Sequence, residues 1–208
     1  MKKTIVFLFI FLFATACNKK RTLHIKAINA VTGEPYAGLA YGISATTTGI
    51  GGEKKVYDHK GTLDANGEAF VTLRVRGNRT YNVGCTKPPN TCYVKDINFS
   101  FGKEDKTKND FQFEYAECGY IQLKVKNISC YDANDKIFFN LKPSYTDPNY
   151  KIIQMTKLGC FDFEFIDEPV PYGPWIATWQ VTKNGVTSNY DSTFYINENQ
   201  HYYFLLEY

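Results

Sequence analysis

The sequence predicts an all-β protein made of two tandem β-sandwich domains. Aromatic residues make up 16% of the chain, with 16 Tyr and 16 Phe, and Tyr, Phe, Val, Ile and Thr are the residue types that strands favour. Short apolar and alternating runs are separated by turn residues along the whole chain, which is typical of a sandwich. No stretch keeps the i, i+3, i+4, i+7 spacing of an amphipathic helix.

The first half consists of strand-like runs separated by turns. The TGEP run at 32–35 predicts a turn, and the DANG run at 64–67 contains an Asn-Gly step, the strongest short hairpin signal. The glycine-rich stretch at 46–53 predicts a flexible loop. The remaining runs predict strands at 22–29, 38–45, 68–75, 79–85, 93–101 and 110–115.

A boundary is expected at Glu117-Cys118-Gly119, because a second series of strand-like runs begins directly after it. Asn184-Gly185 predicts another hairpin. The expected strands of this half lie at 120–128, 136–142, 151–156, 160–166, 175–182, 192–196 and 202–208. We therefore expect one domain at 22–117 and a second at 118–208, each with about seven strands.

Three runs of the first half (VTGEPYAGLAYGI, GTLDANGEAFVTLRVRG and RTYNVGC) resemble the carboxypeptidase regulatory-like domain. The resemblance implies an immunoglobulin-like or transthyretin-like sandwich that serves as a structural or binding accessory, without catalytic residues. The positions that carry it are Thr32, Gly33, Glu34, Pro35, Gly38, Asp64, Gly67, Phe70, Leu73 and Tyr81.

The first 17 residues predict export. A basic start, Met1-Lys2-Lys3, precedes the apolar run at 5–13 and the small residues at 14–16, which together make a signal peptide. The run is too short to span a bilayer as a helix. Because Cys17 follows at once, the segment resembles a bacterial lipoprotein signal. The resemblance implies a signal peptide at 1–16 and acyl chains such as palmitate on Cys17; an ordinary signal peptide with a chance cysteine is the alternative.

The residues after Cys17 predict where such a lipoprotein would lie. We expect a tether at 17–21, with three consecutive basic residues at 19–21 that favour anionic lipid by about 1 kcal/mol each. In lipoproteins of this type the residue after the cysteine influences sorting. Asn18 is not the aspartate that retains such proteins at the inner membrane, so the resemblance implies the outer membrane. We expect its periplasmic face.

Charge and motif content exclude several functions. The formal net charge is +3, so there is no basic excess for nucleic acid. With three histidines and no CxxC or HxxxH spacing, neither a metal nor another cofactor is expected. The Gly-x-Ser-x-Gly nucleophile signature does not occur. We therefore expect a protein that is not an enzyme, with a membrane and an envelope protein or a glycan as partners.

Five cysteines follow Cys17 in what would be an oxidising compartment. Cys85 and Cys92 bracket a turn-rich loop, which predicts a disulfide between them. A strand-like run would hold Cys118 and Cys130 about 25–30 Å apart, whereas a bridge needs Cα atoms within about 7 Å. We therefore expect Cys130–Cys160 or Cys118–Cys160, with one cysteine left over.

The favoured functional hypothesis is a non-catalytic structural or interaction module of the cell envelope. The alternative is a glycan-binding lipoprotein of an outer-membrane uptake system. It depends on Tyr172, Trp175 and Trp179, which could form an aromatic platform for sugars or could instead be core residues.

A third hypothesis, a hydrolase, depends on two carboxylates. Asp162 and Glu164 alternate with phenylalanines, so in a strand they share one face about 7 Å apart. That spacing could serve glycoside chemistry or bind calcium. The favoured interpretation is a solvent-exposed face opposite a phenylalanine core face.

Overall fold

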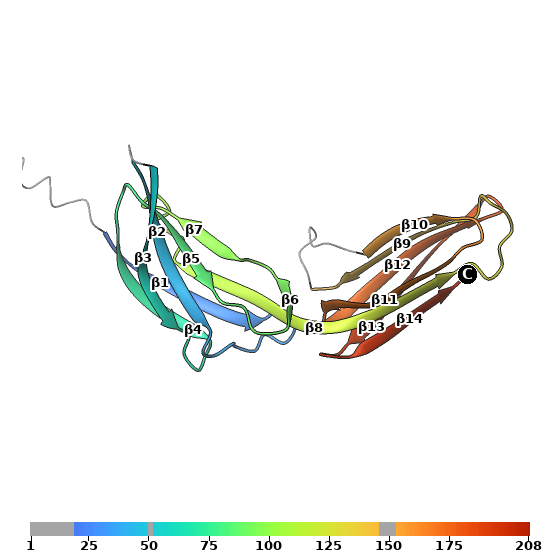
Figure 1. The fold of residues 1–208 in the computed structure, drawn as a ribbon, viewed down its shortest axis with the longest axis horizontal. Coiled ribbons are helices and arrows are strands. Elements are labelled where there is room, and N and C mark those ends of the chain that lie inside the picture. The colour runs from blue at the N-terminus through green and yellow to red at the C-terminus, as the bar shows by residue number, and fades with distance from the viewer. Residues whose placement is uncertain (1–18, 50–51, 146–152) are drawn as a thin grey trace, which may run out of the picture. The chain divides into compact units, whose positions relative to one another are not determined.

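Figure 1 shows a computed structural model that describes residues 19–49, 52–145 and 153–208. This part of the chain contains strands and turns and no helix, so the predicted all-β class is confirmed. The strands are β1 (Lys19–Asn29), β2 (Ala40–Gly49), β3 (Gly52–Thr62), β4 (Glu68–Val75), β5 (Thr80–Cys85), β6 (Thr91–Val94), β7 (Asn98–Phe101), β8 (Asp110–Lys126), β9 (Lys136–Pro143), β10 (Ile153–Leu158), β11 (Asp162–Pro171), β12 (Gly173–Lys183), β13 (Val186–Ile196) and β14 (His201–Glu207).

The chain divides into two compact units. Of the described residues, the first unit comprises those up to Asn29 together with those in Gly33–Pro88 and Asp96–Glu114, and the second comprises those in Ala30–Thr32, Pro89–Lys95 and Tyr115–Tyr208. The main division between the units falls between Glu114 and Tyr115, three residues before the predicted boundary, and β8 runs across it without interruption from Asp110 to Lys126. β8 therefore supplies residues to both units.

In the first unit, β4, β1 and the start of β8 form one sheet, and β3-β2-β5-β7 form the other. Because successive side chains of a strand point to opposite faces of its sheet, alternate residues of each strand face the core between the two sheets. On β1, Leu23, Ile25 and Ala27 are fully buried. The two sheets meet through aromatic side chains: the Phe99 ring centroid lies 5.0 Å from that of Phe113. The other buried core residues include Ile43, Ala45, Val71, Tyr81, Val83, Phe101 and Phe111.

In the second unit, β11 pairs with β8 antiparallel and β14 pairs with β8 parallel. The facing sheet has the order β10-β9-β12-β13. One hydrophobic core joins the two layers, with buried side chains from β8, β9, β12 and β14: Ile121, Leu123, Val125, Ile137, Phe139, Leu141, Trp175, Ala177, Val181, Phe204 and Leu206.

Two predicted connections are strands instead. The expected loop at 46–53 belongs to β2 and β3, which pair as far as Gly49 opposite Gly52. Thr46–Thr48 favours strand structure, and Gly52 has φ +95°, a conformation that glycine adopts without a steric penalty. The described residues on either side of residues 50–51 therefore belong to strands rather than to a long loop.

Of the expected tether at 17–21, residues 19–21 belong to β1. Residues 17–18, like the expected signal peptide at 1–16, lie outside the described residues. Arg21 lies opposite Leu73 of β4 and is only 9% exposed. Its guanidinium donates hydrogen bonds to Asn109 Oδ1 (3.0 Å) and to the Gly102 and Lys108 carbonyl oxygens (3.1 and 2.6 Å). Arg21 shares the inward parity of Leu23, so it is a structural residue and not a lipid contact.

Candidate functional site

Two of the three aromatic residues expected to contact glycan are core residues. Trp175 is 2% exposed and Tyr172 is 8% exposed, and the Trp175 Nε1 group donates a hydrogen bond to the Pro171 carbonyl oxygen at 3.0 Å. For Trp175 the reason is strand parity, because Trp175 and Ala177 share the face of β12 that packs on β8. Tyr172 precedes β12 and packs against Tyr93 instead. The prediction of a glycan platform at these two residues is therefore wrong.

Trp179 lies further along β12 and is half-buried. Its ring stacks on Tyr190 of β13, with centroids 5.7 Å apart and an interplanar angle of 17°. Tyr190 is half exposed. The Trp179–Tyr190 pair therefore lies across β12 and β13 and does not form a platform with Tyr172 and Trp175, which are buried.

The disulfides differ in part from the prediction. Cys92 pairs with Cys118, so the predicted Cys85–Cys92 bridge is wrong. The reason is the pairing of β6 with β8, where the register shifts between Thr91 and Tyr93 and places Cys92 beside Cys118. The second disulfide is Cys130–Cys160, one of the two pairings that the sequence left open. Cys85 belongs to neither disulfide.

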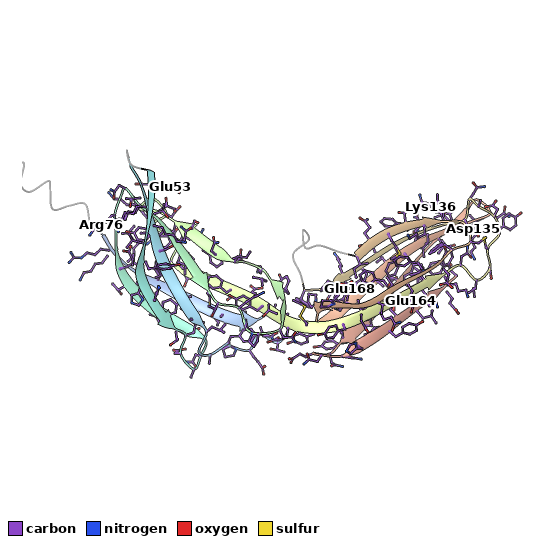
Figure 2. All side chains as sticks on the ribbon, in the orientation of Figure 1. Glu53, Arg76, Asp135, Lys136, Glu164 and Glu168 are labelled. Carbon is purple, nitrogen blue, oxygen red and sulfur yellow. A yellow bond between two sulfur atoms is a disulfide. The ribbon has the colours of Figure 1, made fainter. Side chains whose placement is uncertain are left out.

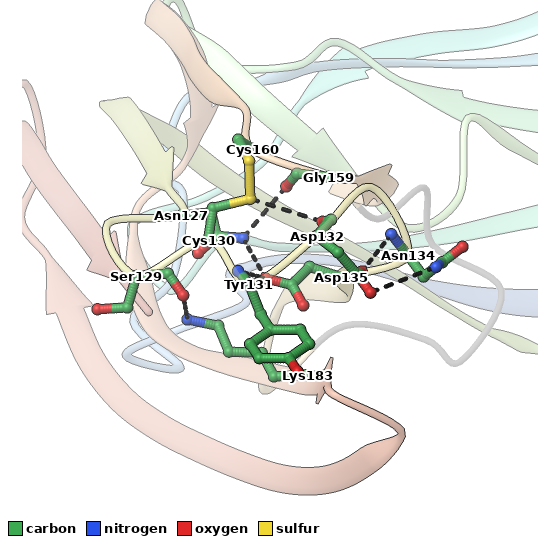
Figure 3. Close-up of a disulfide and its surroundings, with 10 residues drawn as sticks. All are labelled: Asn127, Ser129, Cys130, Tyr131, Asp132, Asn134, Asp135, Gly159, Cys160 and Lys183. Carbon is green, nitrogen blue, oxygen red and sulfur yellow. Dashed lines mark hydrogen bonds between the residues drawn. A yellow bond between two sulfur atoms is a disulfide. The ribbon is translucent and has the colours of Figure 1, made fainter.

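A buried carboxylate lies beside the Cys130–Cys160 disulfide (Figure 3). Asp135 is 1% exposed. Its Oδ2 accepts hydrogen bonds from the Tyr131 amide at 2.8 Å and from the Asn127 side-chain amide at 3.0 Å. The hydrogen bond from the Tyr131 amide is the largest of the effects that lower the pKa of Asp135, and the nearby Lys183 ammonium adds to it. The charged carboxylate therefore stabilises this loop.

Acid should weaken the second unit through Asp135. Its pKa is lowered in the folded chain from 3.8, so its contribution is complete above that pH and is lost as the pH falls below it. We expect urea midpoints, measured by Trp fluorescence, to fall with pH in that range. Asp135→Asn should lower the midpoint at neutral pH and flatten this dependence. An unchanged acid profile in the variant would contradict the assignment.

The two carboxylates considered for hydrolysis form cross-strand ion pairs on a solvent-exposed face. Lys126 Nζ lies 3.6 Å from Asp162 Oδ2, and Lys124 Nζ lies 3.7 Å from Glu164 Oε2. Gln122 donates a further hydrogen bond to Glu164 at 2.7 Å. Figure 2 labels Glu164 on β11. This arrangement is that of the solvent-exposed face favoured by the sequence.

The first unit has an open hollow of about 610 Å³ on the outer face of β2, β3 and β5. The Lys60 and Lys55 ammonium groups lie 4.2 and 5.7 Å from the centroid of the Tyr57 ring, within cation–π range. Asn82 and Asn98 contribute amide groups to its lining. The hollow presents hydrogen-bonding groups, and the sequence did not predict it because β3 itself was not predicted.

No three His, Cys, Asp or Glu side chains come together as a possible metal site among residues 19–49, 52–145 and 153–208. Nor does this part of the chain contain a helix long and apolar enough to cross a membrane.

Strand β13 is a long edge strand whose outer edge carries few charges. It ends the β10-β9-β12-β13 sheet and pairs with β12 over its whole length without a bulge. Its one charged residue is Asp191. By contrast, the edge strand β3 carries lysines and acidic residues and has a register shift at Asp58, which are the usual protections against edge pairing.

The turn between β12 and β13 determines which backbone groups face outward. Lys183 pairs with Val186 around Asn184-Gly185, both with positive φ, as in a two-residue hairpin whose flanking residues form a hydrogen-bonded pair. Hydrogen-bonded positions then alternate along the ladder. The residues that direct N–H and C=O groups away from β12 are Thr187, Asn189, Asp191, Thr193 and Tyr195.

No family model matches this chain, and no curated protein matches it. Solved structures similar to it include the Bacillus anthracis TIE protein (17% identity, TM-score 0.34, covering 91% of this chain and 33% of that one). They also include the minor pilin GBS52 of Streptococcus agalactiae (12%, 0.32, 90% and 94%) and the shaft pilin SpaA of Lactobacillus rhamnosus GG (12%, 0.35, 91% and 97%).

The chain spans a third of the length of the TIE protein and 62% of a streptococcal ancillary pilin. At these identities and TM-scores, the similarity carries no argument about function.

Proposed function

We propose that this chain is a lipid-anchored, non-catalytic structural module of the bacterial cell envelope that associates with a second copy of itself through β13. The observation that carries the proposal is the contrast between the outer edge of β13, whose one charged residue is Asp191, and the charged, bulged edge of β3. The two disulfides support export, since disulfides persist in oxidising compartments. The lipoprotein-like leader supports an anchor at the outer membrane, on its periplasmic face.

A second copy is the partner that best complements β13. When two β13 strands run antiparallel with Tyr190 opposite its own copy, Asn189 lies opposite Asp191 and Thr187 lies opposite Thr193. Aromatic, hydroxyl and amide–carboxylate pairs of this kind each contribute about 0.2–1 kcal/mol. Moving the centre of the pairing from Tyr190 to the next residue would place Asp191 opposite Asp191, and directly opposed like charges destabilise a ladder. The side chains therefore favour the Tyr190-centred register.

Charging the β13 edge should abolish the association. In the Tyr190-centred register, Thr187→Lys with Thr193→Lys places two lysines opposite each other at both ends of the pairing. Both threonines are exposed, so the unit itself should fold. We expect sedimentation equilibrium of the unlipidated chain to show a concentration-dependent dimer for the natural sequence and a monomer for the variant.

The matched control is Thr178→Lys with Gln180→Lys, which adds the same charge to the central strand β12 and should leave the dimer intact. A natural sequence that stays monomeric up to about 1 mM has an interaction weaker than about −4 kcal/mol and would contradict the proposed association.

The anchor makes a separate prediction. Replacing Cys17 with Ser should remove fatty-acid labelling and move the protein from the membrane fraction to the soluble fraction. The folded unit should keep its stability, because β1 begins at Lys19. Persistent labelling of the variant would mean that another residue carries the lipid.

A further inference from the structure

A basic hollow lies where β1 begins and β4 ends. It has a volume of about 380 Å³, and no acidic residue is among the described residues that line it. Arg76, which directly follows β4, is labelled at this end of the first unit in Figure 2. The lining residues are Lys20, Arg21, Thr22, Val75, Lys103, Lys106 and Asn109.

The loop that supplies two of these lysines is held in place by other groups. Arg21 donates to the Gly102 and Lys108 carbonyl oxygens at the two ends of the loop. Within the loop, the Asp105 carboxylate accepts a hydrogen bond from the Gly102 amide at 2.7 Å. The Lys103 and Lys106 side chains are thereby carried on an ordered loop beside β1.

The ammonium groups of the hollow form no ion pair with the residues that the structure describes. Among the described residues, Lys20, Lys103 and Lys106 have no carboxylate within ion-pair distance, whereas the Lys108 Nζ donates to the Ser100 carbonyl oxygen at 2.9 Å. Three lysines facing one hollow repel one another, and a bound anion would offset that repulsion. A phosphate group, with several acceptor oxygens, suits ammonium donors.

The position of the hollow in the chain indicates where the anion comes from. Lys19 begins β1 and pairs with Val75, which lines the hollow. Cys17 is two residues earlier, and two residues reach at most about 7 Å. If Cys17 carries acyl chains, the hollow must lie at the same bilayer surface.

We propose that Lys20, Lys103 and Lys106 form a site for the phosphate of an anionic phospholipid headgroup. This rests on the proposed lipid anchor for its biological setting, although the site itself can be measured without the lipid. The site would fix which end of the first unit faces the membrane, in addition to the anchor that keeps it there.

The test uses the mature chain carrying Cys17→Ser, so that no acyl chain contributes to binding. The probe is a vesicle containing equal parts of phosphatidylglycerol and phosphatidylcholine, and binding is measured by co-sedimentation at low salt. Each lysine near an anionic surface contributes about fivefold in affinity. Lys103→Gln with Lys106→Gln should therefore weaken binding about 25-fold.

The matched control, Lys136→Gln with Lys142→Gln, removes the same charge from β9 of the second unit and should change binding less than twofold. Equal losses in the two variants would overturn the site, because they would indicate attraction by net charge alone.

A third arm distinguishes the sources of the phosphate. Calorimetric titration with inorganic phosphate should show no binding at concentrations that leave vesicle binding intact, whereas tight binding of free phosphate would overturn the headgroup assignment. Loss of fatty-acid labelling at Cys17 is scored separately. Absence of fatty-acid labelling on the natural chain, with vesicle binding intact, would contradict the anchor alone. Weak vesicle binding with normal labelling would contradict the site alone.

Discussion

Replacing Arg21 with alanine is expected to lower the free energy of unfolding of the first unit by about 3 kcal/mol. The buried guanidinium makes three hydrogen bonds, and its carbon lies 5.0 Å from the centroid of the Phe101 ring. The substitution leaves the Gly102 and Lys108 carbonyl oxygens without their donors. It also opens a cavity over an aromatic ring that is 1% exposed.

The two units allow the effect to be located. Both tryptophans lie in the second unit, so Trp fluorescence reports that unit, whereas far-UV circular dichroism reports both. In urea, Arg21→Ala should move the circular dichroism transition and leave the fluorescence transition in place. Arg21→Lys keeps the charge but cannot make the forked contacts, so it should recover only part of the loss. A stability equal to that of the natural sequence would contradict the structural role of Arg21.

Removing the Cys92–Cys118 disulfide is expected to cost the second unit about 3.5 kcal/mol. The two cysteines are separated by 26 residues, and the loss of loop-closure entropy for a loop of that size predicts this amount. Cys92→Ser with Cys118→Ser should therefore lower the urea midpoint seen by Trp fluorescence.

Cys85→Ser is the matched control, since Cys85 belongs to neither disulfide. It should leave the midpoint unchanged. If the control lost as much as the double variant, or if reduction of the natural chain had no effect, the pairing of Cys92 with Cys118 would be contradicted.

Local patterns in the sequence were sufficient for much of the fold. The strand-like run at 22–29 predicted β1, and Asn184-Gly185 predicted the hairpin between β12 and β13. Both depend only on neighbouring residues: strand parity in one case, and the positive φ angles of a two-residue turn in the other.

Features that depend on distant residues could not be predicted in this way. In the sequence, Arg21 belongs to a run of three basic residues, which predicted a tether. It is buried because β1 pairs with β4 and because the loop before β8 accepts its hydrogen bonds. The Cys92–Cys118 disulfide depends on β6 pairing with β8, which no local signal indicates. Trp175 is of a residue type that sugar-binding platforms use, but the burial of its face of β12 depends on which sheet packs against that face.

The edge of β13 lies between these two cases. Its low charge is visible in the sequence, but its position at the end of a sheet, and the alternation of its outward backbone groups, come from the register with β12. The sequence predicted only residues 192–196 as a strand, and the structure was needed to identify the full length of β13 and its free edge.

Residue-resolved amide hydrogen exchange, measured on dilute and concentrated unlipidated protein, tests the proposed association most directly. The Ser188, Tyr190 and Ser192 amides bond to β12 and should be protected at both concentrations. The Asn189, Asp191 and Thr193 amides face outward, and they should become protected only in the concentrated sample. Rapid exchange of these three amides at every concentration would contradict pairing through β13.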